Sequence, residues 1–265
     1  MHTSIPAQTA PHAVTRLIAF DLDDTLAPSK SAIDPRIGDL LIALAERVHV
    51  AIISGGQIAQ FQAQVIENLP DAAPDALSRV HLMPTCGTQY YRFDGTGFSV
   101  VYAHGLTDDE KQRALTAVEE EARRLGLWEA EPWGDILEDR HSQITFSALG
   151  QRAPLEAKIA WDPTGARKNA LREAVAVRIP DLEVRSGGST SVDITHAGID
   201  KAYGMTKLAE VTGISLDDML FVGDRLDPDG NDYPVLAMGV RCHAVQGWIE
   251  TAEYLDELLP TLPVS

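Results

Sequence analysis

Short apolar runs alternate with segments of helical spacing in the first third of the chain. Leu17–Phe20 is apolar throughout and is followed by polar turn residues, which is typical of a strand buried on both faces. Asp34-Pro35 opens a segment whose apolar positions recur at helical spacing. Two further apolar strands, at Val48–Ile53 and Val80–Met83, are separated by a predicted helix over about residues 58–69. This order predicts a parallel sheet with helices on its faces.

The middle of the chain has a different pattern. Thr107–Glu110 has the spacing of a capping box, and a long charged helix follows it and ends near Gly126. A second helix is predicted over about residues 164–177. Short alternating segments, typical of strands, occur at Ile136–Leu137, Gln143–Ala148, Val184–Arg185 and Ser191–Ile194. Strand pairs with helices between them predict a small antiparallel α+β layer.

The parallel-sheet pattern returns after Asp200. Lys201–Thr212 has the pattern of a helix, and Met219–Val222 has that of a buried strand that ends in Gly223-Asp224. We therefore expect an α/β protein with a discontinuous, Rossmann-like catalytic core, residues 1–94 and 196–265. The α+β layer, residues 95–195, would be an inserted cap that sets substrate specificity.

The charge of the chain narrows the classes of partner. The 22 Lys and Arg residues oppose 39 Asp and Glu residues, which leaves a formal net charge of −17. Such a surface repels the phosphates of nucleic acids and anionic lipids, so we expect neither a nucleic acid nor a membrane as a partner. An anionic small-molecule substrate would need a local cationic pocket or a bound metal ion.

The cysteines and the first residues bear on the compartment. Cys86 and Cys242 lack the spacing of metal ligands and are too few for a disulfide framework, which fits a reducing cytoplasm. Residues 1–15 lack the apolar segment of a signal peptide, and no apolar run reaches the length that spans a bilayer. We expect a cytoplasmic protein whose first residues form a mobile tail.

Polar residues follow three of the predicted strands at the same place: Asp21, Ser54 and Asp224. The carboxyl ends of parallel strands meet at the crevice where ligands bind, so these side chains should converge. An extended segment would put the carboxylates of Asp21 and Asp23 on one side, where a divalent cation would offset their repulsion. A simple turn would explain Asp-x-Asp alone, but not the acidic end of a distant strand. Oxygen ligands of this kind suit Mg²⁺.

These residues resemble the motifs of a known family. The segment "FDLDDTL", residues 20–26, resembles the first motif of the haloacid dehalogenase superfamily of phosphotransferases. Ser54, Lys201 and "FVGDRLDPDGND", residues 221–232, match the second, third and fourth motifs in the right order. The chain is most similar to the branch with a large α/β cap (subfamily IIB, Cof-type), and within it to the eukaryotic-type phosphomannomutases. The wide spacing from Asp224 to Asp232 is typical of the latter.

The resemblance implies how phosphate would be transferred. Asp21 would attack the phosphate and form an aspartyl-phosphate, a role that its position also favours. Asp23 would protonate the leaving oxygen and then activate the next acceptor. Ser54 and Lys201 would hydrogen-bond the oxygens of the transferring phosphoryl group. The predicted catalytic residues are Asp21, Asp23, Ser54 and Lys201.

The resemblance also implies a Mg²⁺ cofactor. Asp21, Asp224 and the main-chain carbonyl of Asp23 would hold the ion, which offsets the repulsion between an anionic nucleophile and an anionic phosphate. Asp232 would either lie behind these ligands or bind the ion directly. The predicted metal residues are Asp21, Asp23, Asp224 and Asp232.

The cap departs from the mutase pattern at the positions that would hold a second phosphate. Arg140 matches one cap arginine of the mutases, although an ion pair with Glu138 or Asp139 is an equal alternative. Gln151 stands where another arginine is expected, and Lys158 stands where a third would fall. The residues that we expect at the substrate are Gly55, Arg140, Lys158, Ser191 and Asp193.

The absence of arginine at positions 151 and 158 weakens the case for a bisphosphorylated intermediate, and water can then be the acceptor. We therefore predict a Mg²⁺-dependent phosphatase that hydrolyses a small phosphate monoester, a sugar phosphate, through an aspartyl-phosphate. The alternative is a sugar phosphomutase similar to phosphomannomutase, which would convert mannose or glucose 1-phosphate to the 6-phosphate. A catalytically silent sugar-phosphate binding protein is a third alternative, which the intact motif residues disfavour. The resemblance further implies a homodimer formed through the cap.

Overall fold

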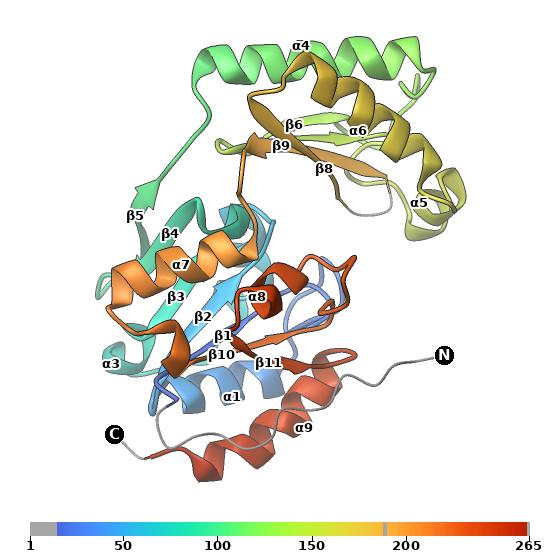
Figure 1. Ribbon diagram of the computed structural model, residues 1–265. Helices are drawn as coiled ribbons and strands as arrows, with labels where there is room; N and C mark the ends of the chain where they lie inside the picture. Colours follow the sequence, from blue (N-terminus) through green and yellow to red (C-terminus); the bar gives the residue numbers. More distant parts are fainter. Residues whose placement is uncertain (1–14, 188–189, 264–265) are drawn as a thin grey trace. The chain divides into compact units, whose positions relative to one another are not determined.

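Figure 1 shows the computed structural model of the chain, which describes residues 15–187 and 190–263. The predicted mobile tail lies outside the described residues, except for Thr15. Contacts between Cα atoms divide the chain into two compact units. The core unit comprises Met1–Ala103 and Asp200–Ser265, and the cap unit comprises His104–Ile199. Among the described residues, no helix is both long and apolar enough to cross a membrane.

The core unit is built on a seven-stranded sheet with the strand order β11-β10-β1-β2-β3-β4-β5. Its parallel strands are β1 (Leu17–Phe20), β2 (His49–Ile53), β3 (Val80–Met83), β10 (Met219–Gly223) and β11 (Arg241–Ala244). The antiparallel strands at one edge are β4 (Gln89–Phe93) and β5 (Phe98–Ala103). The parallel part of the sheet confirms the predicted α/β fold.

Helices cover both faces of this sheet (Figure 1). One group consists of α1 (Pro35–Ala45), α2 (Ile58–Gln64), α3 (Pro74–Leu77) and α9 (Trp248–Leu258). The other consists of α7 (Lys201–Thr212) and α8 (Tyr233–Ala237). Ile18 and Phe20 of β1 pack in the hydrophobic layer of the first group, and Leu17 and Ala19 pack in that of the second. Because β1 is buried on both faces, its sequence is a continuous apolar run.

Four short 3₁₀ helices complete the core unit: η1 (Ile66–Asn68), η2 (Thr85–Gly87), η3 (Leu216–Asp218) and η4 (Leu259–Thr261). The helix predicted over residues 58–69 is interrupted, because α2 ends at Gln64 and η1 follows Val65. Residues 95–103, which the sequence pattern assigns to the insertion, complete the β4–β5 hairpin of the core unit. The carboxylate of Asp94 accepts hydrogen bonds from the main-chain N–H groups of Thr96 and Gly97 and thereby holds the hairpin turn.

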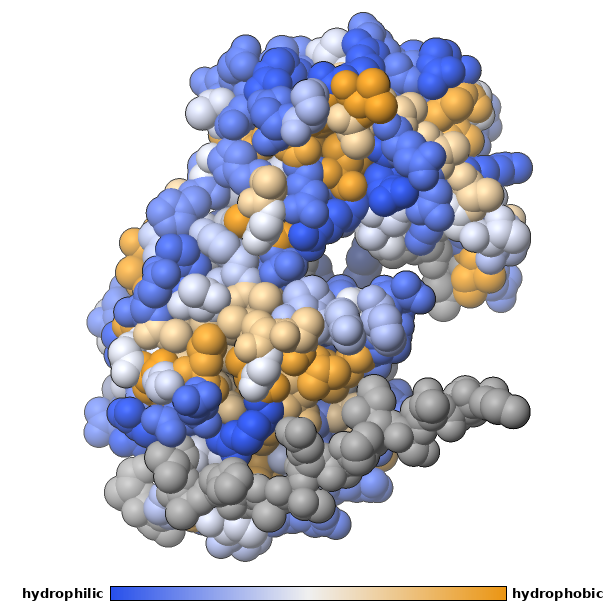
Figure 2. Space-filling model, in the orientation of Figure 1, coloured by the Kyte–Doolittle hydropathy of each residue, from blue (hydrophilic) through white to orange (hydrophobic). Residues whose placement is uncertain are grey.

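The cap unit is a four-stranded antiparallel sheet with helices packed on one face. Its strand order is β6 (Leu137–Asp139), β7 (Gln143–Ser147), β9 (Ser191–His196) and β8 (Leu182–Ser186). Its helices are α4 (Asp108–Arg124), α5 (Leu155–Trp161) and α6 (Ala166–Arg178). The predicted capping box at Thr107 and Glu110 is confirmed. Helix α4 is rich in charged residues, and its outer face is largely hydrophilic (Figure 2).

The two faces of the cap sheet differ in polarity. Ile144 and Phe146 of β7, together with Val192 and Ile194 of β9, pack in a hydrophobic cluster with residues of α4 and α6. The residues that alternate with them are polar and lie on the opposite face. On β7 and β9 these are Gln143, Thr145, Ser147, Ser191, Asp193 and Thr195. We call this the polar face of the cap sheet.

Candidate active site

Asp21 and Asp224 meet because the strands that precede them are neighbours. Asp21 follows β1, Asp224 follows β10, and the two strands pair in parallel. The main-chain N–H of Asp21 continues the ladder by donating to the oxygen of Val222 at 3.0 Å. One carboxylate oxygen from each of Asp21, Asp224 and Asp232 lies within 4.8 Å of the others. We call these three residues the carboxylate cluster.

Lys201 joins two members of this cluster. Its Nζ lies 2.5 Å from Oδ1 of Asp21 and 2.5 Å from Oδ1 of Asp232. Lys201 is the first residue of α7, and the helix start is fixed by the side chain of Asp200, which accepts from the N–H of Tyr203 at 3.0 Å. Burial alone would lower the pKa of Lys201, but the two carboxylates outweigh it and raise this pKa, so the amine is an ammonium ion.

The cluster is electrostatically suited to a cation. Burial raises the pKa of Asp21 to about 7 against the opposing charge of Lys201, and the Asp232 carboxylate adds to the shift. Burial also raises the pKa of Asp224, again with a contribution from Asp232. Burial is the main cause of both shifts, which means that the charged carboxylates lack the stabilisation that water would give them. A hard divalent cation bound by these oxygens would supply this stabilisation, so the donor set fits Mg²⁺.

Asp232 has both carboxylate oxygens engaged. Oδ1 accepts from Lys201, and Oδ2 accepts from the main-chain N–H of Arg225 at 3.0 Å. The side chain is fully buried, and it packs so closely over Gly223 that a Cβ at that position would collide with it. These contacts favour a role behind the metal ligands, where Asp232 orients Lys201. Direct binding of the ion by Asp232 stays a prediction.

The Asp23 carboxylate is turned toward α2 and is not a member of the carboxylate cluster. It accepts from Nε2 of Gln60 at 2.8 Å, from the main-chain N–H of Lys30 at 2.7 Å and from Nε2 of Gln64 at 3.3 Å. If Asp23 contributes to metal binding, its main-chain carbonyl is therefore the group to consider. Gln60 and Gln64 were not predicted from the sequence. Their only signal is the four-residue spacing, which places both on one face of a helix.

Ser54 and Gly55 follow β2 at the same end of the sheet. The hydroxyl of Ser54 accepts from the N–H of Gly56 at 3.1 Å, and the residue is buried. A Cβ added to Gly55 would meet no atom within 4 Å, so the main chain borders open space at this point. Asp21 therefore contacts Lys201 and lies close to Asp224. Ser54 follows β2, which is separated from the strand before Asp224, β10, by β1.

Of the predicted substrate residues of the cap unit, Ser191 and Asp193 lie on its polar face and Arg140 lies beside it. Ser191 and Asp193 are both on this face, and the β7–β9 register places Asp193 opposite Thr145, whose hydroxyl donates to it at 2.7 Å. Burial raises the pKa of Asp193, while the charge of Arg140 opposes the shift. Arg140 itself pairs with Glu138 through Nε at 2.9 Å and Nη2 at 2.8 Å. The ion-pair alternative for Arg140 is thus realised.

Lys158 on α5 contacts Gln151, which lies in the loop after β7. The ammonium group of Lys158, on α5, donates to the main-chain oxygen of Gln151 at 3.3 Å. The main-chain N–H of Gln151 donates to the oxygen of Asp135 at 3.1 Å. The side-chain Nε2 of Gln151 is buried, and it has no hydrogen-bond partner among the residues that the structure describes.

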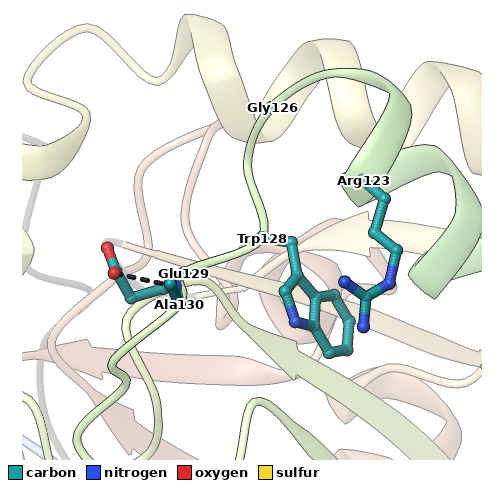
Figure 3. Close-up of a pocket in the computed structure, with 5 residues that line it drawn as sticks. All are labelled: Arg123, Gly126, Trp128, Glu129 and Ala130. Carbon is teal, nitrogen blue, oxygen red and sulfur yellow. Dashed lines mark hydrogen bonds between the residues drawn. The ribbon is translucent and has the colours of Figure 1, made fainter.

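A shallow pocket of about 470 Å³ also occurs in the cap unit (Figure 3). It lies where α4 ends, and the guanidinium carbon of Arg123 stands 4.2 Å from the centre of the Trp128 ring. Trp128 packs against Phe146, whose side chain belongs to the apolar face of the sheet. The pocket is therefore separate from the polar face. Its lining residues are Arg123, Gly126, Trp128, Glu129 and Ala130.

Comparisons with known proteins show which families the chain is similar to. Residues 151–245 match the model of the haloacid dehalogenase-like hydrolase family. The chain is 24% identical to a probable phosphomannomutase of Caenorhabditis elegans, over 96% of this chain and 99% of that protein. It is 24% identical to phosphomannomutase 1 of Homo sapiens, over 88% of each chain.

Among solved structures, an IMP-nucleotidase of Plasmodium falciparum with bound IMP shares the fold, with a TM-score of 0.68 and 15% identity. The match covers 92% of this chain and 66% of that one. The fold is that of an α/β protein, and the carboxylate cluster at the ends of its parallel strands is a candidate enzyme site. The chain is similar to the haloacid dehalogenase-like hydrolases over residues 151–245, and to the phosphomannomutases over most of its length.

Proposed function

We propose that this chain transfers the phosphoryl group of a sugar phosphate through Asp21, in a reaction of the phosphomannomutase type. The observation that carries the proposal is the contact between Asp21 and the buried ammonium group of Lys201, at the end of the central strand β1. A carboxylate held this way keeps a defined orientation, and the adjacent positive charge attracts a phosphate. The chain-wide similarity to phosphomannomutases supports a sugar phosphate as the substrate.

In the first step, a carboxylate oxygen of Asp21 forms a bond to phosphorus, and the bond between phosphorus and the sugar oxygen breaks. Asp23 gives its proton to that leaving oxygen. In the second step, a hydroxyl of the acceptor gives its proton to Asp23 and bonds to phosphorus, which releases the Asp21 carboxylate. Gln60 and Gln64 orient Asp23 between the two proton transfers.

Asp21, Asp224 and the main-chain carbonyl of Asp23 would hold Mg²⁺. When bound, the ion supplies positive charge that offsets the repulsion between a carboxylate and a phosphate. Lys201 and Ser54 would hydrogen-bond the oxygens of the phosphoryl group in transfer, and Asp232 would keep Lys201 in place.

The polar face of the cap sheet would bind the sugar. The hydroxyls of Thr145 and Ser191 and the carboxylate of Asp193 are groups that hydrogen-bond sugar hydroxyls. Arg140 supplies positive charge beside this face for a phosphate of the substrate, and Lys158 on α5 adds a second cation to the cap unit. In a mutase, these cations would hold the phosphate that is not being transferred.

Hydrolysis is the second candidate, and a specific observation favours it. The charge of Arg140 is already matched by Glu138, and Gln151 offers an amide where the mutases resembled by this chain have a guanidinium group. A bisphosphorylated sugar would therefore be held less firmly, and water would compete as the acceptor. The phosphatase prediction from the sequence rests on Gln151 and Lys158, which stand where the mutase pattern has arginines.

One experiment separates the two candidates. The full chain with Mg²⁺ is incubated with mannose 1-phosphate or glucose 1-phosphate, with and without a catalytic amount of the hexose 1,6-bisphosphate. Formation of the 6-phosphate that depends on the bisphosphate supports the mutase, and release of free phosphate supports the phosphatase. Asp21→Asn is the control and should abolish either reaction. If a broad panel of phosphate monoesters gives neither product, both candidates are rejected.

A further inference from the structure

The connection between β3 and β4 contains three consecutive residues in the left-handed region of backbone conformation. Thr85, Cys86 and Gly87 have φ angles of 48°, 55° and 87°. Glycine adopts such angles without steric cost, whereas a β-branched residue such as threonine is a true outlier there. Strain of this kind persists only where the surrounding structure enforces it, and it is concentrated at functional sites. We call these three residues the 85–87 turn.

One side of the 85–87 turn is hydrogen-bonded to the segment that follows β2. The main-chain N–H of Cys86 donates to the oxygen of Ser54 at 2.9 Å, and that of Thr85 donates to the oxygen of Gly56 at 2.9 Å. Inside the turn, the buried hydroxyls of Thr85 and Thr88 lie 2.5 Å apart. Both hydrogen bonds to the Ser54 segment are made in the left-handed conformation of the turn.

The other side of the 85–87 turn is packed against α7, one helical turn after Lys201. A Cβ on Gly204 would lie 2.9 Å from the oxygen of Cys86 and 3.0 Å from Cγ2 of Ile53. A Cβ on Gly87 would lie 2.6 Å from the Cα of Gly204. The helix therefore approaches the turn more closely than any side chain at these two glycines would permit.

We propose that the 85–87 turn is a spacer that sets the position of Ser54 relative to Lys201, with Gly87 and Gly204 as its positioning residues. The inference rests on the proposed function, in which Ser54 and Lys201 grip the same phosphoryl group. The turn is bonded to the main chain of the first and is in contact with the helix that carries the second. A shift at either contact would change the separation of the two phosphate-binding groups while leaving both side chains intact.

The first test is Gly204→Ala, with Gly97→Ala as the matched control, because a Cβ at Gly97 meets no atom within 4 Å. The added methyl group on α7 must displace the main chain of Cys86 or the helix start. A misplacement of about 1 Å in an active site can lower the rate by about a hundredfold. We expect kcat to fall by at least tenfold, with KM for the sugar phosphate little changed, since the sugar is bound elsewhere. Inhibition by orthovanadate, which resembles a phosphoryl group in transfer, should weaken in parallel.

A second pair of variants keeps the test decisive if Gly204→Ala does not fold. Cys86→Val adds a second β-branched residue to a turn that already holds Thr85 at a φ of 48°, and this added strain should force the turn out of the left-handed region, with the same loss of kcat and of vanadate inhibition. Cys86→Gly favours that region and should retain both. Equal losses in the two Cys86 variants would mean that the thiol and not the backbone matters, and would overturn the proposal.

The wild-type chain separates this inference from the proposed function. If the wild type turns over a sugar phosphate and is inhibited by vanadate, but Gly204→Ala and Cys86→Val behave like Gly97→Ala, the spacer role alone is rejected. If the wild type turns over no sugar phosphate, the proposed function fails, and the inference fails with it. Thermal melting of each variant shows whether a loss of kcat follows from unfolding.

Discussion

The ammonium group of Lys201 lies 2.5 Å from Oδ1 of Asp21, and the two side chains are only 1% and 4% exposed. Removing two opposite charges from water is costly, and their attraction compensates only when further hydrogen bonds satisfy the remaining groups. Asp232 provides one such bond to Lys201, and it is itself bonded to the N–H of Arg225. The pair therefore depends on a network that spans the ends of β1, α7 and the loop after β10.

Lys201→Met should destabilise the fold as well as abolish catalysis. The variant leaves two buried carboxylates without their cation, and breaking a buried pair in this way costs about 3–5 kcal/mol in free energy of unfolding. Lys207→Met is the matched control on the same helix, because Lys207 forms a surface pair with Glu210. Urea denaturation of the metal-free proteins measures the difference. Equal stability of the two variants would contradict the network described above.

The carboxylate cluster is the part of the candidate site that can be expected from the sequence. Buried strands are visible as apolar runs, parallel pairing aligns their ends, and Asp21 and Asp224 stand directly after two such runs. The contacts of Asp23 cannot be expected in this way. They depend on the left-handed conformation of Asp24, with a φ of 63°, and on a helix face that is defined only once α2 is packed.

The β4–β5 hairpin was likewise not evident from the sequence. Its outer strand, Phe98–Ala103, is largely exposed and lies at the edge of the sheet, so no alternation of buried and exposed positions marks it. A register shift at Tyr90/Tyr91 in the pairing with β4 disturbs the period further. Edge strands of this kind are specified by tertiary pairing more than by side-chain pattern.

Substitutions of Asp224 and Asp232 should affect Mg²⁺ binding differently. Asp224→Asn removes a carboxylate that we propose as a direct ligand, and it should weaken Mg²⁺ binding by at least tenfold, on the order of the effects seen for changes around metal sites. Asp232→Asn removes a group that is already engaged by Lys201 and Arg225, so its effect on Mg²⁺ affinity should be smaller. Calorimetric titration with Mg²⁺ gives both affinities. A larger loss in Asp232→Asn would assign Asp232 as a direct ligand.

Gln60→Met should slow proton transfer without changing the fold. Nε2 of Gln60 donates to the Asp23 carboxylate at 2.8 Å, and loss of this bond frees the group that we propose as the acid and base. A positioned acid or base contributes about 10²–10⁴-fold, so we expect kcat to fall by about tenfold or more. Gln62→Met is the control, since Gln62 is exposed on the same helix. A shift in the pH–rate profile of Gln60→Met alone would identify the step, and identical profiles would exclude the role.

His81 should make the core unit less stable in mild acid. It is buried between Nδ1 of His49 at 2.9 Å and the hydroxyl of Tyr90 at 2.7 Å, and burial lowers the pKa of His81 to about 3, with smaller contributions from His49 and Arg92. Between that value and the ordinary pKa near 6.5, the unfolded chain binds a proton that the folded chain does not. Stability from this group is therefore complete above about pH 6.5 and falls by about 1.4 kcal/mol for each pH unit below it.

His81→Gln removes the titrating group and keeps a donor and an acceptor. Urea denaturation at pH 6.5 and at pH 4.5 should show a loss for the wild type that exceeds the loss for the variant by about 2 kcal/mol, which is less than two pH units of the slope above because the unfolded histidine is already half protonated at pH 6.5. The comparison cancels the carboxylates, including Asp21, because both proteins contain them. The same loss in both proteins would show that His81 stays protonated or exposed in the fold.

The choice of acceptor should respond to charge beside the polar face of the cap sheet. Glu138 matches the charge of Arg140 at 2.8 Å, in a pair whose side chains are 21% and 15% exposed. Glu138→Gln leaves the guanidinium group in place and releases its charge toward a bound phosphate. Gln151→Arg adds the guanidinium group that the mutase pattern has at this position. Both variants should lower severalfold the concentration of hexose 1,6-bisphosphate that gives half-maximal formation of the 6-phosphate.

Glu173→Gln is the matched control for this change, because Glu173 pairs with Arg172 on α6 and is mostly exposed. It removes the same charge from the cap unit without touching the polar face, so it should leave the bisphosphate dependence unaltered. The ratio of 6-phosphate to free phosphate should rise in Glu138→Gln and Gln151→Arg and stay constant in Glu173→Gln. If all three variants give the wild-type ratio, the second phosphate is not held by this part of the cap, and the acceptor is selected elsewhere.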